Sequence, residues 1–443
     1  MLKESELFEP SQPLYGKQAE LFAGRTEALE RAVLASLEAH SLVMLYGDLG
    51  IGKSSAARQL YMILNQDEYA KRRYPTLTSH VWDTRPRHLV PIWFSCRDYD
   101  DMDGVLRAIC FSQAQDANDT LAKLFPGFPE KTRKWLIDAA LEAKLGVVGA
   151  SVKAQRTEDQ SSQDIAQARD EYLKSVRGID VFLHLLAKLQ EEDPLADVVI
   201  ILDDFERLMD KSDFPAIFLR ADSVRFVLVG IAENPAELVE HNQSLERHLV
   251  DRQIRIERLD EQEVSWIFEN ASSLALKHQG VKKLTFTDAF VREVAGISGG
   301  LPMIVQYYGR KALRVSKALL KLNNDAVTID TDAIPLIEAD FFDISKGVEP
   351  NLIARIQEGV GQSVARPRVL RAIADRFESW FDLGQVRRIP DLATVSKIED
   401  HLDKLVDARV LAKSDETGRY RFWTPTCRML CRRVPERNAM PGF

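Results

Sequence analysis

Short apolar runs along the chain alternate with longer stretches in which apolar residues recur every three to four positions. The runs predict strands near 42–46, 90–94, 198–202, 225–229 and 253–257, and the stretches between them predict helices. The run at 198–202 contains no polar residue, which indicates a strand buried on both faces. This alternation predicts an α/β fold, a parallel sheet with helices on both faces. Pro91 weakens the second strand, because proline donates no ladder hydrogen bond.

The spacing of the second and third strands predicts an insertion. About 100 residues separate them, far more than one crossover helix needs. Helical periodicity covers 103–124 and 130–145, and the stretch 151–162 is polar. We therefore predict a helical insertion at about 98–190 with a flexible loop at its tip. A surface that binds a protein partner and a passive decoration both stay open as interpretations.

Two further domains follow the sheet domain, which we predict to span 1–257. Beyond residue 258 the pattern predicts only helices, and Asp260 and Glu263 have the spacing of a capping box that opens a helix running to residue 276. A second helix is predicted over 290–295, with glycines after it. We expect 258–345 to form a helical lid domain.

The last segment, 346–443, predicts a winged-helix domain. Three short helical patterns cover 366–377, 381–387 and 395–406. Two strands at 410–413 and 420–423 flank a turn at 414–419, which is the pattern of a hairpin.

Composition excludes several classes of protein. The 443 residues are 45% hydrophobic and 28% charged, which is average for globular domains and excludes a disordered or fibrous chain. No apolar run approaches the ~20 residues that a bilayer-spanning helix needs, and the first residues lack the pattern of a signal peptide. We expect a cytoplasmic protein with no membrane partner. Its four cysteines, too few for a disulfide framework or a zinc site, predict buried or half-buried thiols in a reducing compartment.

The strongest chemical signal is the segment 47–54, which matches G-x-x-x-x-G-K-[ST] at every position. Its members are Gly47, Asp48, Leu49, Gly50, Ile51, Gly52, Lys53 and Ser54, and we add Ser55 to the predicted nucleotide contacts. Glycines let successive amides face a phosphate, and the helix that follows adds its partial positive charge. We expect Lys53 to reach the β- and γ-phosphates and Ser54 to ligate Mg²⁺. The strand before this segment and the helix after it disfavour a ligand-free glycine turn.

Two acids follow the buried third strand. We expect Asp203 to be the protein's carboxylate partner for Mg²⁺ and Asp204 to orient or deprotonate the attacking water. Glu206 is a weaker candidate for the second role. Because acids also end strands for structural reasons, these assignments depend on the phosphate-binding segment upstream.

Together these motifs resemble the P-loop NTPases of the AAA+ and STAND type, in particular the branch of origin-recognition initiators, transposition ATPases and bacterial NLR-like switches. The resemblance implies ATP and Mg²⁺ as ligands and hydrolysis of the β–γ phosphoanhydride. Residues 21–29 look like the family's GR-x-x-E-L box, which implies that Gly24 and Arg25 pack on the adenine.

The resemblance also implies residues that respond to the γ-phosphate. A polar sensor after the strand at 225–230 falls at 232–234, where Asn234 is favoured over Ala232 and Glu233. An arginine that reaches a neighbouring subunit falls at Arg247, with Arg252 behind it. The alternative for Arg247 is a surface arginine paired with a neighbouring acid.

The lid contains a further match, because 300–302 reads G-x-P, as in STAND proteins. This match implies that Pro302 packs on the nucleotide base and links nucleotide state to lid position. Proline at the first position of a helix is the ordinary structural alternative. Arg310, further along the same segment, is a second candidate for a sensor.

Three functions stay open. The leading one is an ATP-binding and hydrolysing switch, with slow or partner-stimulated turnover, whose nucleotide state controls self-assembly into a homo-oligomer or partner engagement. A DNA-associated ATPase of initiator or transposition-regulator type, using the winged helix, is the first alternative. A scaffold that holds ADP with little turnover is the second.

Charge bears on the DNA alternative. The formal net charge is -8, but 361–443 carry 16 lysines and arginines against 11 acids, which suits an anionic partner as well as a solvated basic surface. Four acids in the segment 395–407 oppose phosphate and weaken a recognition role for that helix. If the domain binds DNA, we expect Lys413, Arg419 and Arg421 to meet phosphates. The best remaining candidates for nucleic-acid contact are the terminal Arg428, Arg432 and Arg433.

Overall fold

The computed structural model describes residues 7–8, 13–14, 16–83, 88–98, 100–111, 177–232, 239, 243–279, 283–320, 326–339, 350–377, 380–414 and 417–434. Most of the predicted insertion, including 130–145 and 151–162, lies outside these residues. The chain forms two compact units. One comprises Met1–Arg25, Asp48–Ser55 and Ile256–Phe443, and the other comprises Thr26–Gly47 and Ala56–Arg255.

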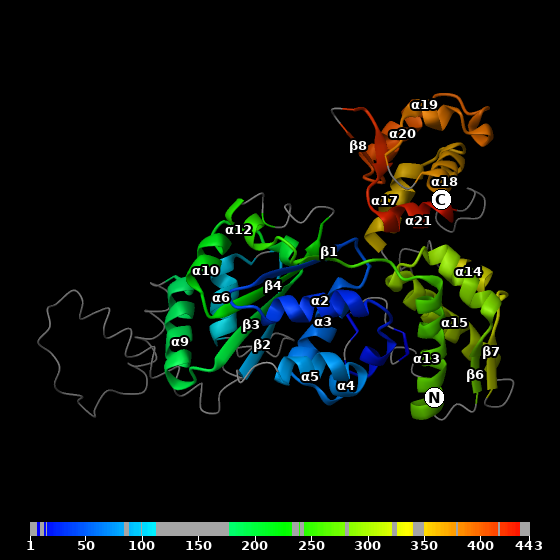
Figure 1. The fold of residues 1–443 in the computed structure, drawn as a ribbon. Coiled ribbons are helices and arrows are strands. Elements are labelled where there is room, and N and C mark those ends of the chain that lie inside the picture. Colours follow the sequence, from blue (N-terminus) through cyan, green and yellow to red (C-terminus); the bar gives the residue numbers. More distant parts are fainter. Residues whose placement is uncertain are drawn as a thin grey trace, which may run out of the picture. The chain divides into compact units, whose positions relative to one another are not determined.

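The second unit is built on a five-stranded parallel sheet in the order β2-β3-β4-β1-β5 (Figure 1). Its strands are β1 (Leu42–Gly47), β2 (His88–Ser95), β3 (Ala196–Asp203), β4 (Val224–Ile231) and β5 (Gln253–Arg255). The five predicted strands and their parallel arrangement are confirmed. Pro91 is tolerated because β2 lies at the edge of the sheet, where one side of the strand needs no partner.

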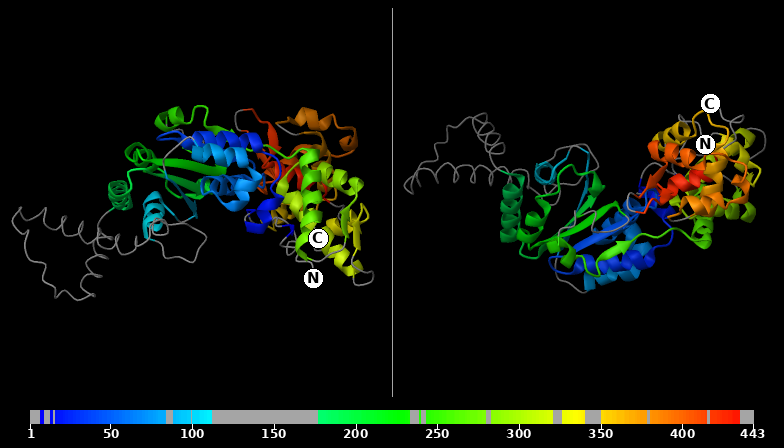
Figure 2. Two further views of the ribbon diagram at one scale, coloured as in Figure 1. Left: turned by 60° about the horizontal axis from the view of Figure 1, so that its bottom comes forward. Right: turned by 90° about the horizontal axis from the view of Figure 1, so that it is seen from above.

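Both faces of this sheet are covered, which confirms the predicted fold class. Every residue of β3 is buried, although successive side chains point to opposite faces. One face packs against α6 (Met102–Phe111), α9 (Gly178–Glu192), α10 (Phe214–Arg220) and α12 (Gln243–His248). On the other face lies α2 (Thr26–Leu37), which contacts β1, β4 and β5. Figure 2 shows the same sheet from two further directions.

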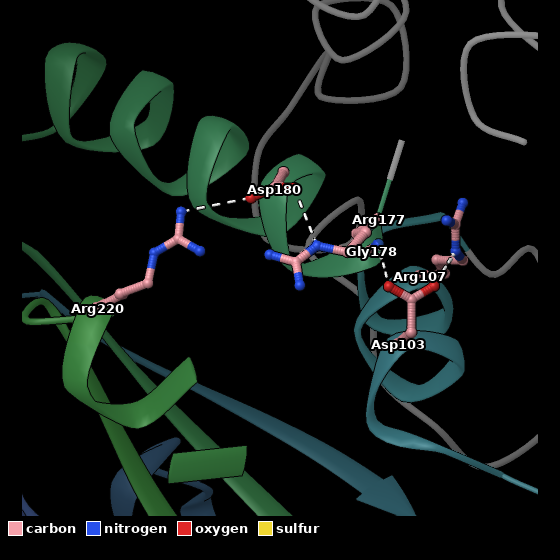
Figure 3. Close-up of polar contacts among 6 residues, drawn as sticks. All are labelled: Asp103, Arg107, Arg177, Gly178, Asp180 and Arg220. Carbon is pink, nitrogen blue, oxygen red and sulfur yellow. Dashed lines mark hydrogen bonds and ion pairs between the residues drawn. The ribbon is translucent and has the colours of Figure 1, made fainter. Parts of the chain in front are cut away.

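Polar contacts join α6 and α9, the two described helices at the ends of the predicted insertion (Figure 3). The Asp103 carboxylate of α6 accepts a hydrogen bond from the Gly178 amide at the start of α9, and its second oxygen lies 2.6 Å from Nε of Arg107. Asp180 of α9 in turn lies 3.3 Å from Nη2 of Arg220. A Cβ added to Gly178 would lie 2.5 Å from the Asp103 carbonyl oxygen, so only glycine allows this approach.

We expect Gly178→Ala to lower the free energy of unfolding by about 1–3 kcal/mol, because the added methyl overpacks the contact between α6 and α9. Urea unfolding followed by circular dichroism measures the change. Gly296→Ala is the matched control, since nothing lies within 4 Å of the added Cβ and alanine suits a helix interior. Equal stabilities of the two variants would contradict the close approach.

The lid region contains a sheet as well as helices. Its helices are α13 (Glu261–Gln279), α14 (Asp288–Ser298), α15 (Pro302–Leu320) and α16 (Ala333–Ala339). The prediction of helices alone was wrong, because β6 (Lys283–Phe286) and β7 (Ala326–Ile329) pair in parallel. Each strand has four residues, too few for an alternating pattern to stand out from a helical one. The predicted capping box is confirmed: Asp260 and Glu263 exchange side-chain-to-amide hydrogen bonds of 2.9 and 2.7 Å.

The C-terminal region has the predicted winged-helix elements. Helices α18 (Arg366–Arg376), α19 (Leu383–Arg387) and α20 (Ile398–Asp407) correspond to the three helical patterns, and β8 (Leu411–Lys413) pairs antiparallel with β9 (Tyr420–Phe422). The structure adds α17 (Pro350–Val360) and α21 (Pro425–Arg432). Helix α20 begins three residues later than predicted, because Lys397 has a left-handed backbone with φ of 53°.

Two further features of the described residues concern membrane-spanning helices and the cysteines. Among the described residues, no helix has both the length and the apolar character needed to cross a bilayer. The four cysteines, Cys96, Cys110, Cys427 and Cys431, are free thiols and are buried, as predicted.

Candidate nucleotide-binding site

The loop between β1 and α3 (Lys53–Leu64) requires its glycines. Gly47, Gly50 and Gly52 have φ of 146°, 75° and 93°, values that residues with a Cβ rarely adopt. At Gly50, an added Cβ would also lie 3.0 Å from Cε of Met303. The loop therefore turns tightly between strand and helix and keeps its backbone uncovered by side chains of its own.

The backbone amides of this loop fit an anion. The amides of Gly50 and Gly52 donate no hydrogen bond to any residue that the structure describes. Ile51 donates only a long bond of 3.4 Å, to the Asp48 carbonyl. Such donors at the start of a helix need an acceptor, and the helix dipole favours a negative one. A phosphate group fits this requirement.

Lys53 lies at the first position of α3, with only 7% of its surface exposed. Its Nζ donates a 2.7 Å hydrogen bond to the Asp48 carbonyl oxygen, which holds the ammonium over its own loop. A buried ammonium is costly without such partners, so the position favours an added anionic one. The two serines that follow differ. Ser54 is half-buried, whereas Oγ of Ser55 accepts a 3.1 Å bond from the Leu14 amide and ties down the N-terminal segment.

Arg25 contacts the loop between β1 and α3 directly. Its Nη2 donates a 2.9 Å hydrogen bond to the carbonyl of Ile51, and its Nη1 donates a 3.0 Å bond to Ala23. Burial lowers the pKa of Arg25 to about 10, and the nearby Glu263 carboxylate opposes this shift. Gly24 and Arg25 both have left-handed backbones, which direct the guanidinium to the loop. The structure thus gives Arg25 a loop contact that the sequence did not indicate.

The start of α15 also lies against the loop, within the same unit. The Met303 amide donates a 3.3 Å hydrogen bond to the Gly50 carbonyl, and Cγ of Pro302 lies 3.7 Å from the Cβ position of Gly52. Nη2 of Arg258, just before the lid helices, lies 3.7 Å from Oδ2 of Asp48. The sequence indicated Pro302 as a nucleotide contact but did not indicate Arg258 or Met303, although Met303 directly follows Pro302.

In the second unit, Asp203 ends β3 and is 3% exposed. Because all five strands are parallel, their carboxyl ends meet at one sheet edge, where Gly47 ends β1. The register pairs Leu202 with Leu228 of β4, and Leu228 with Met44 of β1. Ligands of open parallel sheets bind outside this edge. Asp203 is therefore placed for such a ligand.

Further carboxylates lie close to Asp203. Burial raises the pKa of the Cys96 thiol, and the charges of Asp100, Asp203, Asp204 and Glu206 raise it further, so these groups share one acidic environment. The Cys96 amide donates a 2.8 Å bond to the Asp203 carbonyl, which fixes this thiol beside the acids. Within the described ranges, no cluster of three or more histidine, cysteine or acidic side chains has the geometry of a complete metal site.

Asp204 has a left-handed backbone, with φ of 55° and ψ of 39°. A conformation of this kind costs on the order of 1–3 kcal/mol in a residue with a Cβ and is concentrated at functional sites. Its carboxylate lies 3.9 Å from Nη1 of Arg207, which is itself held by Asp98 through bonds of 2.9 and 2.8 Å. Glu206 is half-buried in the 3₁₀-helix η3 (Phe205–Arg207).

The residues predicted as sensors and as the arginine finger differ in exposure and in their partners. Arg247 is exposed on α12 and forms no ion pair with a residue that the structure describes. Arg252 forms an ion pair with Glu38. Asn234 and Glu233 lie outside the described residues, and Arg310 is half-buried in α15. The roles of these residues stay predictions.

Most of the arginines predicted to meet DNA have partners within the chain. Arg428 is buried, with 7% exposure, and its Nε donates a 2.8 Å hydrogen bond to the Ala374 carbonyl. Nε of Arg432 donates a 3.2 Å bond to the same carbonyl. Nη2 of Arg433 lies 3.6 Å from Glu293. Arg428 thus stabilises the domain interior and is not a surface ligand for phosphate.

Comparison with solved structures finds likenesses of low sequence identity over most of the chain. The Aeropyrum pernix ORC2 protein, described in ADPNP–ADP complexes, matches with a TM-score of 0.40 and 13% identity over 95% of this chain and 94% of that one. The Aeropyrum pernix ORC1 protein in complex with DNA matches with a TM-score of 0.38 and 13% identity, over 97% and 96% of the two chains. Cdc6p from Pyrobaculum aerophilum has a TM-score of 0.38 and 12% identity, over 98% and 97%.

The other two comparisons found nothing. No protein-family model matches the chain. No curated protein matches it in sequence. Because all three TM-scores lie below 0.5, the fold class rests on the strand order and the loop described above.

Proposed function

We propose that this chain binds ATP with Mg²⁺, hydrolyses it, and uses the nucleotide state to control self-assembly or the engagement of a partner. The loop 47–53 is the observation that carries the proposal. It combines three glycines at positive φ, two amides without a protein acceptor among the described residues, and a buried lysine at a helix start. This combination suits a β-phosphate better than any neutral ligand.

The residues divide the binding of the triphosphate between them. The amides of the loop hold the β-phosphate, and Lys53 exchanges its bond to Asp48 for the phosphate oxygens. Ser54 and Asp203 would hold Mg²⁺, consistent with the few protein ligands that this ion usually takes at such sites. When bound there, Mg²⁺ neutralises charge that develops on the β- and γ-oxygens.

Hydrolysis requires a positioned water. We assign Asp204 to orient or deprotonate it, with Glu206 as the reserve candidate. Asn234 is proposed to contact the γ-phosphate, and Arg247 to reach the γ-phosphate of a neighbouring copy. The exposure of Arg247 and its lack of an ion pair with described residues suit that role.

The lid provides the means of switching. Two contacts join it to the loop that holds phosphate, through Met303 and Arg258, and Pro302 lies beside Gly52. A change in phosphate occupancy of the loop therefore acts directly on the lid contacts. A complete switch between two states needs about 5.5 kcal/mol of differential binding, which the γ-phosphate and its cation can supply.

Solution mass measured by light scattering tests the proposal. With a non-hydrolysable ATP analogue we expect a larger species than with ADP. In a separate assay with ATP we expect the chain to release phosphate, at a rate that falls as the ATP is consumed. One mass in both states, with no phosphate release by the chain, would favour the ADP-holding scaffold instead. The alternative of a DNA-associated ATPase depends on whether the winged-helix domain offers a surface that can bind nucleic acid.

A further inference from the structure

The hairpin of β8 and β9, which we call the wing, has buried and exposed side chains that alternate along β9 and the residues next to it. Tyr420 and Phe422 are 2% and 8% exposed and point into the domain, whereas Arg419 and Trp423 are exposed and Arg421 is half-buried. Because successive side chains of a strand point to opposite faces, Arg421 lies on the outer face of β9, and Arg419 and Trp423 are exposed directly before and after this strand.

A second tryptophan joins this face from another segment. Phe381 forms an antiparallel bridge with Tyr420, with amide-to-carbonyl bonds of 2.8 Å in both directions. The pairing brings Trp380 beside Arg421, whose guanidinium carbon lies 4.8 Å from the centre of the indole ring. Trp380 is 39% exposed and Trp423 is 46% exposed. We call Trp380, Arg419, Arg421 and Trp423 the wing platform.

The cations near the wing platform differ in whether an acid neutralises them. The neighbouring Lys413 is neutralised by Asp403 at 2.9 Å, and Lys404 of α20 by Asp407 at 3.1 Å. The side chain of Arg419, in contrast, makes no ion pair or hydrogen bond with any described residue. The wing platform therefore combines planar aromatic surface with guanidinium groups, the two features that bases and phosphates require.

A duplex does not suit this surface. The faces of paired bases are covered by their stacked neighbours, so an indole ring can stack only on bases that are unpaired. Helix α20, which a duplex would meet through its major groove, carries four acids. We propose that the wing platform binds single-stranded nucleic acid, with bases stacked on Trp380 and Trp423 and phosphates held by Arg419 and Arg421. This inference goes beyond nucleotide hydrolysis and does not depend on it.

Fluorescence anisotropy of a labelled oligothymidylate of roughly 15 nucleotides tests the inference on the full chain, with ADP present throughout. Trp423→Ala and Trp380→Ala are each expected to raise Kd by about 5- to 150-fold, the effect of losing one stacked base. Trp423→Phe should restore most of the affinity, because it keeps an aromatic face. Arg419→Gln should weaken binding and flatten its salt dependence.

Val364→Ala is the matched control, because it removes an apolar side chain that is 75% exposed in the same domain, and it should leave Kd unchanged. Unchanged oligonucleotide binding by the double variant Trp380→Ala with Trp423→Ala would overturn the inference. Equal affinity of the unmodified chain for duplex DNA of the same sequence would also overturn it. It would also be overturned if the variants bind no less oligonucleotide but dissociate an oligomer in light scattering, since the wing platform would then join copies of the chain. ATP affinity measured on each variant separates this result from the proposed function.

Discussion

Lys53→Ala is expected to weaken ATP binding by roughly 10²-fold or more, since truncating one partner of a buried, hydrogen-bonded charge pair costs about 2–5 kcal/mol. The ammonium is 7% exposed and already lies 2.7 Å from a carbonyl of the phosphate-binding loop. No neighbouring side chain of that loop can take its place, because the loop positions 50 and 52 are glycines. Isothermal titration calorimetry with ATP and Mg²⁺ measures the change.

Lys188→Ala provides the control for Lys53→Ala. Lys188 is a lysine of α9 that pairs with Glu191 one helical turn away at 2.9 Å, and its loss should leave ATP affinity unaltered. A melting temperature near that of the unmodified chain shows that Lys53→Ala remains folded. Undiminished ATP affinity in the folded variant would count against the assignment of the loop.

Asp197→Ala is expected to lower the free energy of unfolding by about 3–5 kcal/mol, a large part of the stability of an ordinary domain. Asp197 of β3 and Arg225 of β4 form a 2.8 Å ion pair whose side chains are 7% and 2% exposed. Nε of Arg225 also donates a 2.8 Å bond to the Glu38 carbonyl at the end of α2. Removing the carboxylate leaves a buried guanidinium without its counter-charge.

Two further variants sharpen this test by urea unfolding. Asp222→Ala removes an acid that is 91% exposed and should change stability by no more than about 0.5 kcal/mol. The double variant Asp197→Leu with Arg225→Met replaces the pair by apolar groups and should recover most of the loss. A double variant as unstable as Asp197→Ala would show that the site requires charge for another reason.

The sequence predicted the sheet because its strands are long and apolar enough to be recognised. Continuous apolar runs such as 198–202 are buried on both faces, and only a strand at the centre of a covered sheet requires that. The same argument failed for β6 and β7, whose four residues alternate too briefly to be told from a helix turn.

The candidate site was predictable where one segment carries it. The motif at 47–54 specifies its own turn, since the positions that need positive φ are glycines. The contacts of Arg258 and Met303 with the loop were not predictable, because they join residues that are far apart in the sequence through tertiary packing. The same reason applies to the ion pair between Asp197 and Arg225, which the sequence shows only as two ordinary charges.

The wing platform is a case in which the sequence shows the local pattern but not its surroundings in the fold. Its alternation of arginine and tryptophan with Tyr420 and Phe422 is visible in the sequence as a strand pattern. Its meaning depends on Trp380, which the fold brings from before α19, and on the ion pair that neutralises Lys413. Exposure and pairing are properties of the folded domain, so the sequence alone could not separate Arg419 from Arg428, which is buried.

The most direct test compares the binding of ATP, ADP and AMP to the unmodified chain by calorimetry in the presence of Mg²⁺. If the amides of the loop and Lys53 hold the β-phosphate, ATP and ADP will each bind at one site and AMP will bind roughly 10²-fold more weakly, because it has no β-phosphate. Equal affinity for AMP, or no binding of ATP at millimolar concentration, would contradict a phosphate-binding role for this loop.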